Sequence, residues 1–361
     1  ITMLEDKEGF LYPQVNTYDC IDCHLCEKVC PVLHSGKPRK PLNVYAAKNK
    51  DEKIRLQSSS GGVFSSLAEA IINAGGVVFG AKFDEEWKVV HGYTETKDGI
   101  ADFRGSKYVQ SWMGDNFSKV KYFLDNGRKV LFSGTPCQVA GLKRFLRKPY
   151  ENLLTVDLVC HAVPSPLIYK QYINMCSTKL GQKVMSINMR YKQTYGWSHR
   201  FSYCFYFENG QKAVDPVWVV NWGKIFFSQM INRPSCHSCK YSNLDRPGDF
   251  TIADFWDDKK NRPDLYSCEG TSLLMVNTNM GLDLINKLYD SIDLWKITKD
   301  EAMQPCLIRP TCSNQRRQEF WEFYLLRGFD AAYKKYFGDS KYVITKKIVK
   351  QIIKRVLRKL Q

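Results

Sequence analysis

The fold class of this 361-residue chain is decided by the stretch Lys129-Val130-Leu131-Phe132-Ser133-Gly134-Thr135-Pro136. Its apolar first half predicts a short buried strand, and Ser133-Gly134 ends that strand in a turn. Pro136 suits the first turn of a helix, which we expect to run to about Arg147. A strand that enters a helix directly is typical of α/β proteins.

The same alternation continues on both sides of this stretch. Helices are expected at 61–75, at 115–125 and from Ser165-Pro166 onward, and strands at 77–81, 88–93 and 153–159. This spacing predicts an α/β (mixed α+β) fold with a mostly parallel sheet covered on both faces. Beyond about residue 183 the pattern changes: we expect longer aromatic strands such as 201–207, a strand at 250–253, and helices near 281–292 and 316–328.

Composition excludes several classes of protein. Hydrophobic residues make up 44% and charged residues 25%, which is typical of a folded globular chain. The sequence contains no run of about 18 apolar residues, so no membrane-spanning helix is predicted. The first residues do not resemble a signal peptide, and a cytoplasmic location is therefore expected. The formal net charge is +16, but eight basic residues lie beyond Ser340, so a nucleic-acid-binding surface is not expected.

The strongest motif is a cysteine run near the start of the chain. Cys20, Cys23, Cys26 and Cys30-Pro31 reproduce the bacterial ferredoxin spacing C-x2-C-x2-C-x3-C-P. In this spacing the first three thiolates bind one 4Fe-4S cluster and the fourth cysteine ligates a second cluster. Zinc is the alternative, because C-x2-C also suits a zinc site.

A two-cluster ferredoxin needs a second copy of this run, and residues 1–45 hold only one. Together with the first residue, Ile1, this leads us to expect that the natural reading frame extends upstream and carries the other copy. The alternative is that Cys30 folds back and completes a single cluster.

Four further cysteines form a second candidate set. Cys137 follows Pro136 at a predicted helix start, Cys160 follows the predicted strand at 153–159, and Cys236 and Cys239 form a C-x2-C pair. Four thiols are the number needed for a tetrahedral sulfur site. The alternative is that they are buried or free thiols. The remaining cysteines show no ligand spacing; they are Cys176, Cys204, Cys268, Cys306 and Cys312.

The sequence resembles the coenzyme F420 hydrogenase/dehydrogenase beta-subunit family. The matching stretches extend over most of the chain; they are Ser58–Phe64, Gly105–Ser111, Ser133–Leu142, Asp157–Pro166 and Asp249–Trp256. The resemblance implies an FAD-binding flavoprotein with a 4Fe-4S cluster beside the flavin, held by Cys137, Cys160, Cys236 and Cys239. In members fused to a ferredoxin, two further clusters occupy the N-terminal module.

These observations predict four regions along the chain. They are a partial ferredoxin-like iron–sulfur module (1–45), an α/β flavin-binding region (46–170), a C-terminal region of the same family (171–338) and a basic amphipathic tail (339–361). The tail repeats apolar residues every fourth position from Ile344 to Leu360. It is suited to an anionic membrane surface, so peripheral contact with the inner membrane is one expectation; docking on the protein itself or on a partner is the other.

The expected flavin contacts lie in three glycine- and hydroxyl-rich segments. Ser60, Gly61 and Gly62 open a predicted helix, whose N-terminus could face a pyrophosphate. The second segment is Gly105, Ser106, Lys107 and Tyr108, and the third contact is Thr135. The alternatives are an ordinary helix cap and a surface turn.

The sequence therefore predicts an iron–sulfur flavoprotein oxidoreductase that relays electrons between 4Fe-4S clusters and FAD. Its redox partner would be a ferredoxin, F420 or another soluble electron carrier, or an organic substrate, with a link to polysaccharide synthesis. The alternative is a non-catalytic electron-transfer or scaffold subunit that serves a membrane-associated enzyme. No catalytic residue is assigned, because a lone histidine such as His161 is more often structural.

Overall fold

A large mixed sheet forms the centre of the molecule. The computed structural model describes residues 1–34, 39–194, 196–197, 202–256, 262–339, 342–346 and 348–349. The sheet has eight strands in the order β13-β3-β12-β11-β7-β6-β4-β5. In chain order these strands are β3 (Asn43–Asn49), β4 (Val77–Phe83), β5 (Val89–Thr94), β6 (Val130–Gly134), β7 (Leu153–Leu158), β11 (Phe250–Asp254), β12 (Ser272–Val276) and β13 (Ile292–Lys296).

The strand directions define one functional edge of this sheet. Strands β4, β6, β7 and β11 are parallel neighbours. Strand β3 is antiparallel to β12, which is antiparallel to β11, so β3 runs with the parallel set. Five strands therefore end at the same side, here named the carboxyl edge. The sheet is mixed rather than mostly parallel. Strands β12 and β13 both pair antiparallel with β3, which lies far from them in the sequence, and β12 also pairs antiparallel with β11.

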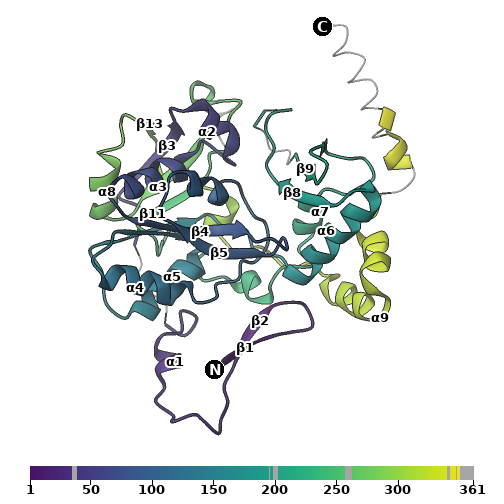
Figure 1. Ribbon diagram of the computed structural model, residues 1–361, viewed down its shortest axis with the longest axis horizontal. Helices are drawn as coiled ribbons and strands as arrows, with labels where there is room; N and C mark the ends of the chain where they lie inside the picture. Colours follow the sequence, from purple (N-terminus) through teal and green to yellow (C-terminus); the bar gives the residue numbers. More distant parts are fainter. Residues whose placement is uncertain are drawn as a thin grey trace.

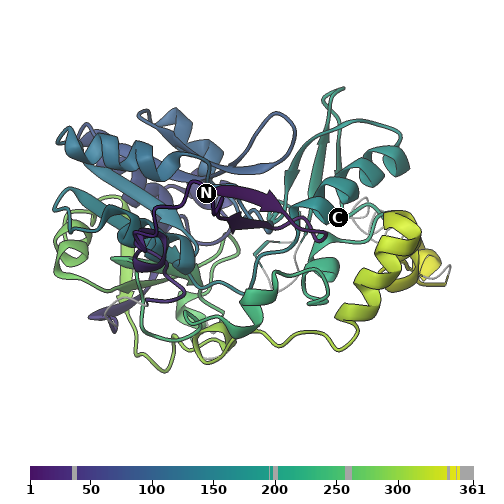
Figure 2. The same ribbon diagram turned by 90° about the horizontal axis from the view of Figure 1, so that it is seen from below.

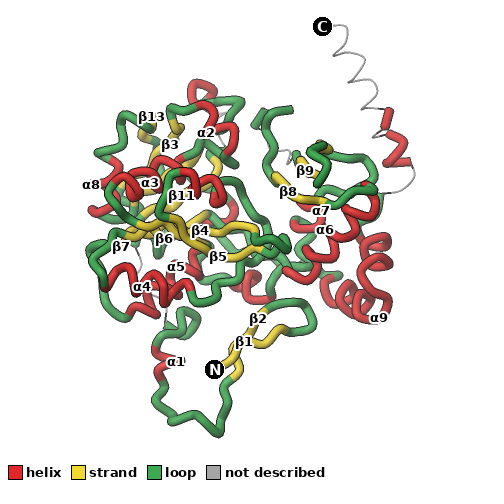
Figure 3. The backbone as a smooth tube through the Cα atoms, in the orientation of Figure 1, coloured by secondary structure: helices red, strands yellow, loops and turns green. Residues whose placement is uncertain are grey.

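Helices cover both faces of the sheet, as predicted. Along β4 and β6, Val78 and Leu131 face a core with α3 (Val63–Asn73), whereas Val77 and Val130 face a core with α4 and α5. This alternation follows from the two-residue period of a strand. Figure 3 shows α3 on one side of the strands and α4 and α5 on the other. The other helices of this part are α2 (Glu52–Gln57), α4 (Asn116–Asp125), α5 (Pro136–Leu146) and α8 (Asn279–Ile285).

A second part of the body packs against the β5 end of the large sheet. Its small antiparallel sheet has the order β10-β9-β8, and its core is rich in aromatic side chains such as Tyr172, Trp222 and Phe320. In Figures 1 and 2 this part lies at the opposite end of the body from α8. Its elements are α6 (Pro166–Leu180), β8 (Val184–Asn188), β9 (Cys204–Phe207), β10 (Lys212–Val214), α7 (Trp222–Phe226) and α9 (Arg317–Tyr336).

Several predicted boundaries differ from the structure. The strand expected at 201–207 is described only from Cys204, and the helix expected at 281–292 ends at Ile285 because β13 begins at Ile292. The helix expected at 316–328 continues to Tyr336 across a kink at Gly328, whose φ is 75°. The division at residue 170 does not separate two bodies, because β11, β12 and β13 return to the first sheet.

The N-terminal region packs on the body through the buried residues 8–10, where Glu8 pairs with Arg317, and the rest of it projects. It contains a hairpin of β1 (Thr2–Glu5) and β2 (Leu11–Gln14) and the single-turn helix α1 (Leu25–Lys28). Figure 1 shows the hairpin and α1 below the large sheet. The body begins slightly earlier than the predicted boundary at residue 45, because Asn43 is already in β3.

Most of the predicted amphipathic tail lies outside the described residues. Where the chain is described, no helix combines the length and the apolar character that crossing a membrane requires.

Candidate functional site

The turn between β6 and α5 places Cys137 at the carboxyl edge. Thr135 caps α5: its backbone N–H donates to Gln138 Oε1 at 2.9 Å, in a capping box. Pro136 takes the first helical position, where its missing N–H has no consequence. The Thr135 hydroxyl lies 3.1 Å from Cys137 Sγ. Thr135, predicted as a flavin contact, is thus beside a predicted cluster ligand.

The other three thiols of the predicted set gather at the same edge. Cys160 follows the end of β7, Cys236 lies in the short 3-10 helix η2 (Pro234–Ser238), and Cys239 caps that helix. Cys160 lies within electrostatic range of Cys137, Cys236 and Cys239. The fold therefore brings together four thiols that lie up to about a hundred residues apart in the sequence.

The thiols are largely shielded from water. Burial raises the pKa of Cys160 well above its ordinary value and the pKa of Cys236 to about 11. Desolvation also raises the pKa of Cys137, although part of its side chain reaches the surface. The free thiols of Cys137, Cys160 and Cys236 are thus neutral at physiological pH, and a metal that binds them as thiolates must displace their protons.

Among the described residues, no three side chains of His, Cys, Asp or Glu lie close enough to hold one metal ion.

A fifth thiol, Cys306, was missed by the sequence analysis. It lies within electrostatic range of Cys160, and its Sγ is 3.6 Å from His161 Nδ1. Gln229 Nε2 lies 2.6 Å from the other ring nitrogen of His161, and burial lowers the pKa of this histidine. Cys306 belongs to no spacing motif, so no sequence signal indicated its position.

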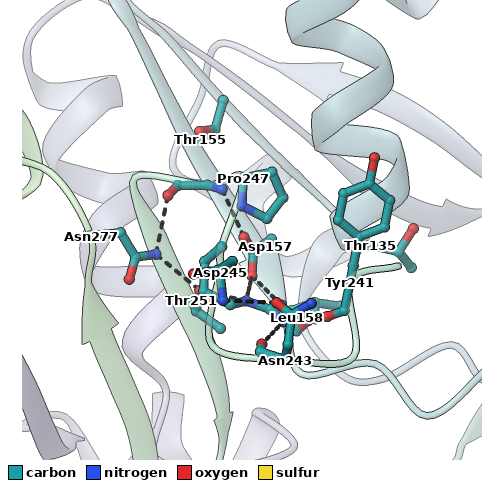
Figure 4. A network of polar contacts seen from close by, with 12 residues as sticks. Thr135, Thr155, Asp157, Leu158, Tyr241, Asn243, Asp245, Pro247, Thr251 and Asn277 are labelled. Atoms are coloured by element: carbon teal, nitrogen blue, oxygen red, sulfur yellow. Dashed lines mark hydrogen bonds and ion pairs between the residues drawn. The ribbon is translucent and has the colours of Figure 1, made fainter. Parts of the chain in front are cut away.

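A buried ion pair joins the two segments that carry Cys160 and Cys239. The Asp157 and Arg246 side chains are 0% and 1% exposed, and Arg246 Nη2 donates to Asp157 Oδ1 at 2.6 Å. The same guanidinium donates to the carbonyl of Leu158 at 2.7 Å and to those of Tyr241 and Asn243 at 2.9 and 3.2 Å. Figure 4 shows these groups converging at the end of β7. Arg246 thus fastens the loop after Cys239 to the strand before Cys160.

The predicted Ser60–Gly62 contacts lie at the same carboxyl edge, but against the sheet. Gly61 N–H donates to Ser272 Oγ at 2.8 Å, and Ser60 Oγ donates to the Thr271 carbonyl at 2.8 Å. A Cβ on Gly61 would lie 2.4 Å from the Ala47 carbonyl oxygen. Gly61 is therefore required by this close packing, whereas Gly62 caps α3 with a φ of 83°.

The segment with Gly105, Ser106, Lys107 and Tyr108 runs from this loop to the stretch of chain that follows Cys160. At one end, the backbone N–H of Ser106 donates to Ser59 Oγ at 2.6 Å. At the other end, the backbone N–H of Gln110 donates to the carbonyl of Pro164, four residues beyond Cys160, at 3.2 Å. Between them, the Tyr108 ring stacks on Phe226 at 5.4 Å.

Buried cations accumulate along this edge. Lys107 Nζ donates to two backbone carbonyls, and burial lowers the pKa of Lys107 to about 7. Lys192 Nζ donates to the carbonyls of Arg55 and Ser60 at 2.7 Å and to that of Glu269. Burial also lowers the pKa of Lys192 to about 7, while the negative charges of Asp254 and Glu269 act in the opposite direction and favour the charged form. Over the described ranges, neither ammonium forms an ion pair with a carboxylate.

A third cation, Arg190, lies closer to the end of β11. Its Nη1 is 3.1 Å from Asp254 Oδ2, and its guanidinium lies 5.2 Å from the centre of the Trp256 ring. Trp256 in turn stacks on Trp197 at 5.1 Å. Arg190 and Lys192 were not predicted, because nothing in their local sequence distinguishes them from surface cations.

The remaining predicted ligands are in the projecting N-terminal region. Cys20, Cys23 and Cys26 are exposed and Cys30 is partly buried. A cavity of about 730 Å³ between α6, α9 and residues 217–220 is lined by none of the predicted site residues.

Comparison with known proteins identifies the family. Residues 44–115 match the model of the coenzyme F420 hydrogenase/dehydrogenase beta subunit N-terminus, and residues 127–301 match that of its C-terminus. The two matches cover about two thirds of the chain. The chain belongs to this family. The predicted membership is thereby confirmed.

Two individual proteins illustrate the relationship. One subunit of the F(420)H(2) dehydrogenase of Methanosarcina mazei is 23% identical over 177 residues, which are 47% of this chain and 47% of that protein. The match thus spans about half the length of this relative. A chain of the F420-reducing NiFe hydrogenase complex from Methanosarcina barkeri is 19% identical with a TM-score of 0.50. That match covers 82% of this chain and 92% of the other, and it supports the mixed α/β fold.

Proposed function

We propose that this beta-subunit family member is an iron–sulfur flavoprotein oxidoreductase that relays electrons between a 4Fe-4S cluster and FAD. Its redox partner would be a soluble carrier or an organic substrate. The observation that carries the proposal is the carboxyl edge of the sheet, where four thiols gather within electrostatic range of Cys160 and where Lys107 and Lys192 also lie. In open α/β sheets, ligands bind outside the carboxyl ends of the parallel strands.

Cys137, Cys160, Cys236 and Cys239 would hold the cluster, which supplies one-electron chemistry when bound. The chain's own part is to fix these thiols and to exclude water. Thr135 positions the start of α5, and Arg246 fixes the loop after Cys239 to β7. Burial and hydrogen bonds to sulfur are the means by which a protein sets a cluster's potential.

The flavin assignment rests on charge and on the path of one segment. Lys107 and Lys192 donate to backbone carbonyls, and among the described residues neither forms a direct ion pair, although Asp102 acts on Lys107 and Asp254 and Glu269 act on Lys192. A diphosphate near Ser60 and Ser106 would add a direct ionic partner for these two cations. The segment to Gln110 runs from this region toward Cys160, so an extended ligand along it would reach the thiols.

The N-terminal cysteines would form an electron-entry module. Their ferredoxin spacing supports this role, and their exposure suits contact with a redox partner. Cytoplasmic location, with membrane contact through the basic tail, remains part of the proposal.

Anaerobic purification followed by quantitation of iron, sulfide and flavin tests the proposal. We expect iron and sulfide in equal amounts and one FAD per chain. The Cys160→Ala variant should lose about four irons per chain, because one cluster contains four. Cys312→Ala is the matched control, since this exposed thiol lies outside the predicted set. Zinc in place of iron would refute the cluster, and stoichiometric iron without flavin would refute the FAD assignment.

A second candidate is a non-catalytic electron-transfer subunit of a larger enzyme. It is favoured by the structural similarity to one chain of a hydrogenase complex. Electron transfer between an artificial donor and acceptor distinguishes the two: the isolated chain turns over in the first case and only with a partner in the second.

A further inference from the structure

Two consecutive side chains of the body hold the N-terminal cysteine region. Lys240 Nζ donates to the Val32 carbonyl at 2.7 Å, and the Tyr241 hydroxyl donates to the Pro31 carbonyl at 3.3 Å. Both donors bind backbone carbonyls directly after Cys30. The last cysteine of the ferredoxin-type run is therefore attached to the loop that follows Cys239.

Tyr241 connects the two groups of cysteines. It lies two residues after Cys239, its hydroxyl donates to the carbonyl of the residue after Cys30, and its phenol is within electrostatic range of Cys30, Cys137 and Cys239. Helix α5 completes the contact, because a Cβ on Gly141 would lie 4.0 Å from Pro31 Cγ.

The loop that carries these donors is itself rigidly attached. Arg246 donates to the carbonyl of Tyr241, and the same guanidinium is paired with the fully buried Asp157. Because the body loop is held in place, it does not move with the Cys30 segment. The separation between the two cysteine groups therefore depends on the hydrogen bonds from Lys240 and Tyr241 and on the surface around these two side chains.

We propose that Lys240 and Tyr241 form a docking seat for the segment Cys30–Val32, and that Tyr241 is the positioning residue that sets the separation between the N-terminal and body cysteine groups. The role follows from the physics of electron tunnelling, whose rate falls exponentially with distance. The inference deepens the proposed function and rests on it for its redox meaning, but the docking itself requires neither iron nor flavin.

Thiol labelling of the folded, metal-free full chain tests the docking. The rate of Cys30 alkylation by iodoacetamide is measured by peptide mass spectrometry relative to Cys20 in the same molecule. Tyr241→Phe removes only the hydroxyl and should raise the relative rate about two- to tenfold, the range expected for one neutral hydrogen bond. Tyr241→Leu also removes the ring and should raise it further.

Internal controls separate docking from general stability. Unfolding also exposes the buried Cys176 to labelling, whereas loss of docking raises the labelling of Cys30 and leaves Cys176 protected. Tyr122→Phe, which changes an exposed tyrosine on α4, should leave the ratio unchanged. If Tyr241→Leu does not fold, the milder Tyr241→Phe variant still decides the matter.

An unchanged Cys30:Cys20 ratio in folded Tyr241→Phe and Tyr241→Leu would overturn the docking seat. Because this readout is made without metal, its failure is distinct from failure of the proposed function. A chain without iron would refute the cluster but leave the labelling result intact. In iron-loaded protein, Tyr241→Leu should additionally slow electron arrival at the body cluster relative to the unsubstituted chain, observed by freeze-quench electron paramagnetic resonance.

Discussion

Replacing Arg246 by Met removes the cation that joins β7 to the loop after Cys239. Asp157, which is 0% exposed, would keep only the Gly248 N–H, at 2.7 Å, of its described hydrogen-bond donors. The carbonyls of Leu158 and Tyr241 would lose their guanidinium donor as well. The loop would then no longer be held against the strand that precedes Cys160.

The expected loss of stability follows from burial. Removing one partner of a buried ion pair costs about 3–5 kcal/mol, because the other charge remains in a medium that solvates it poorly. For a large domain, such a loss lowers Tm by roughly 6–15 °C. The double variant Arg246→Met/Asp157→Asn should recover part of the loss, because it leaves no buried unpaired carboxylate.

Thermal and urea unfolding followed by circular dichroism measure this effect, and iron content after treatment with a chelator measures the effect on the cluster. Arg262→Met is the matched control: Arg262 also pairs with carboxylates, but Asp264 is 59% exposed, so its loss should cost about 1 kcal/mol or less. A loss below about 1 kcal/mol for Arg246→Met, or no coupling to Asp157→Asn, would show that the pair does not hold the two segments together.

Three further predictions concern the other parts of the site. Cys306→Ala should retain the iron that Cys160→Ser loses; equal losses, measured by metal analysis, would make Cys306 a ligand. FAD affinity, measured by flavin fluorescence from pH 6 to 8.5, should fall as the pH rises through about 7. The reason is that a bound anion raises the pKa of Lys107, so that binding takes up a proton. The Lys107→Met variant should bind FAD more weakly and should show a flatter pH profile. Gly61→Ala should lower the free energy of unfolding by about 1–3 kcal/mol, because the added Cβ would press on a carbonyl of β3. Gly141→Ala in α5 is the control: its Cβ meets only ordinary contacts, so the free energy of unfolding should change by about 1 kcal/mol or less.

The local architecture around the site could be predicted from short windows of sequence. The apolar residues of β6, the turn after Gly134 and Pro136 at the first position of α5 are all found where the sequence placed them. These signals are local, because a strand's burial and a helix's start depend on neighbouring residues. The family resemblance indicated that Cys137, Cys160, Cys236 and Cys239 belong to one site. No spacing rule could show that these four cysteines lie together.

The assembly of the site was decided by contacts between distant residues. Arg246 and Asp157 are 89 positions apart, Lys192 and Ser60 are 132 apart, and Lys240 and Val32 are 208 apart. None of these pairs leaves a periodic pattern, since each depends on which strands become neighbours in the large sheet. The antiparallel return of β12 and β13 escaped prediction for the same reason.

The sequence by itself thus determined that this is an α/β protein of the beta-subunit family with two groups of cysteines. The tertiary structure decided that the body's thiols share one edge with Lys107, Arg190 and Lys192, and that Tyr241 meets the N-terminal run. The physical reason is that backbone hydrogen bonding and local burial select each element, whereas strand order is fixed by the sum of many weak long-range contacts that no single segment encodes.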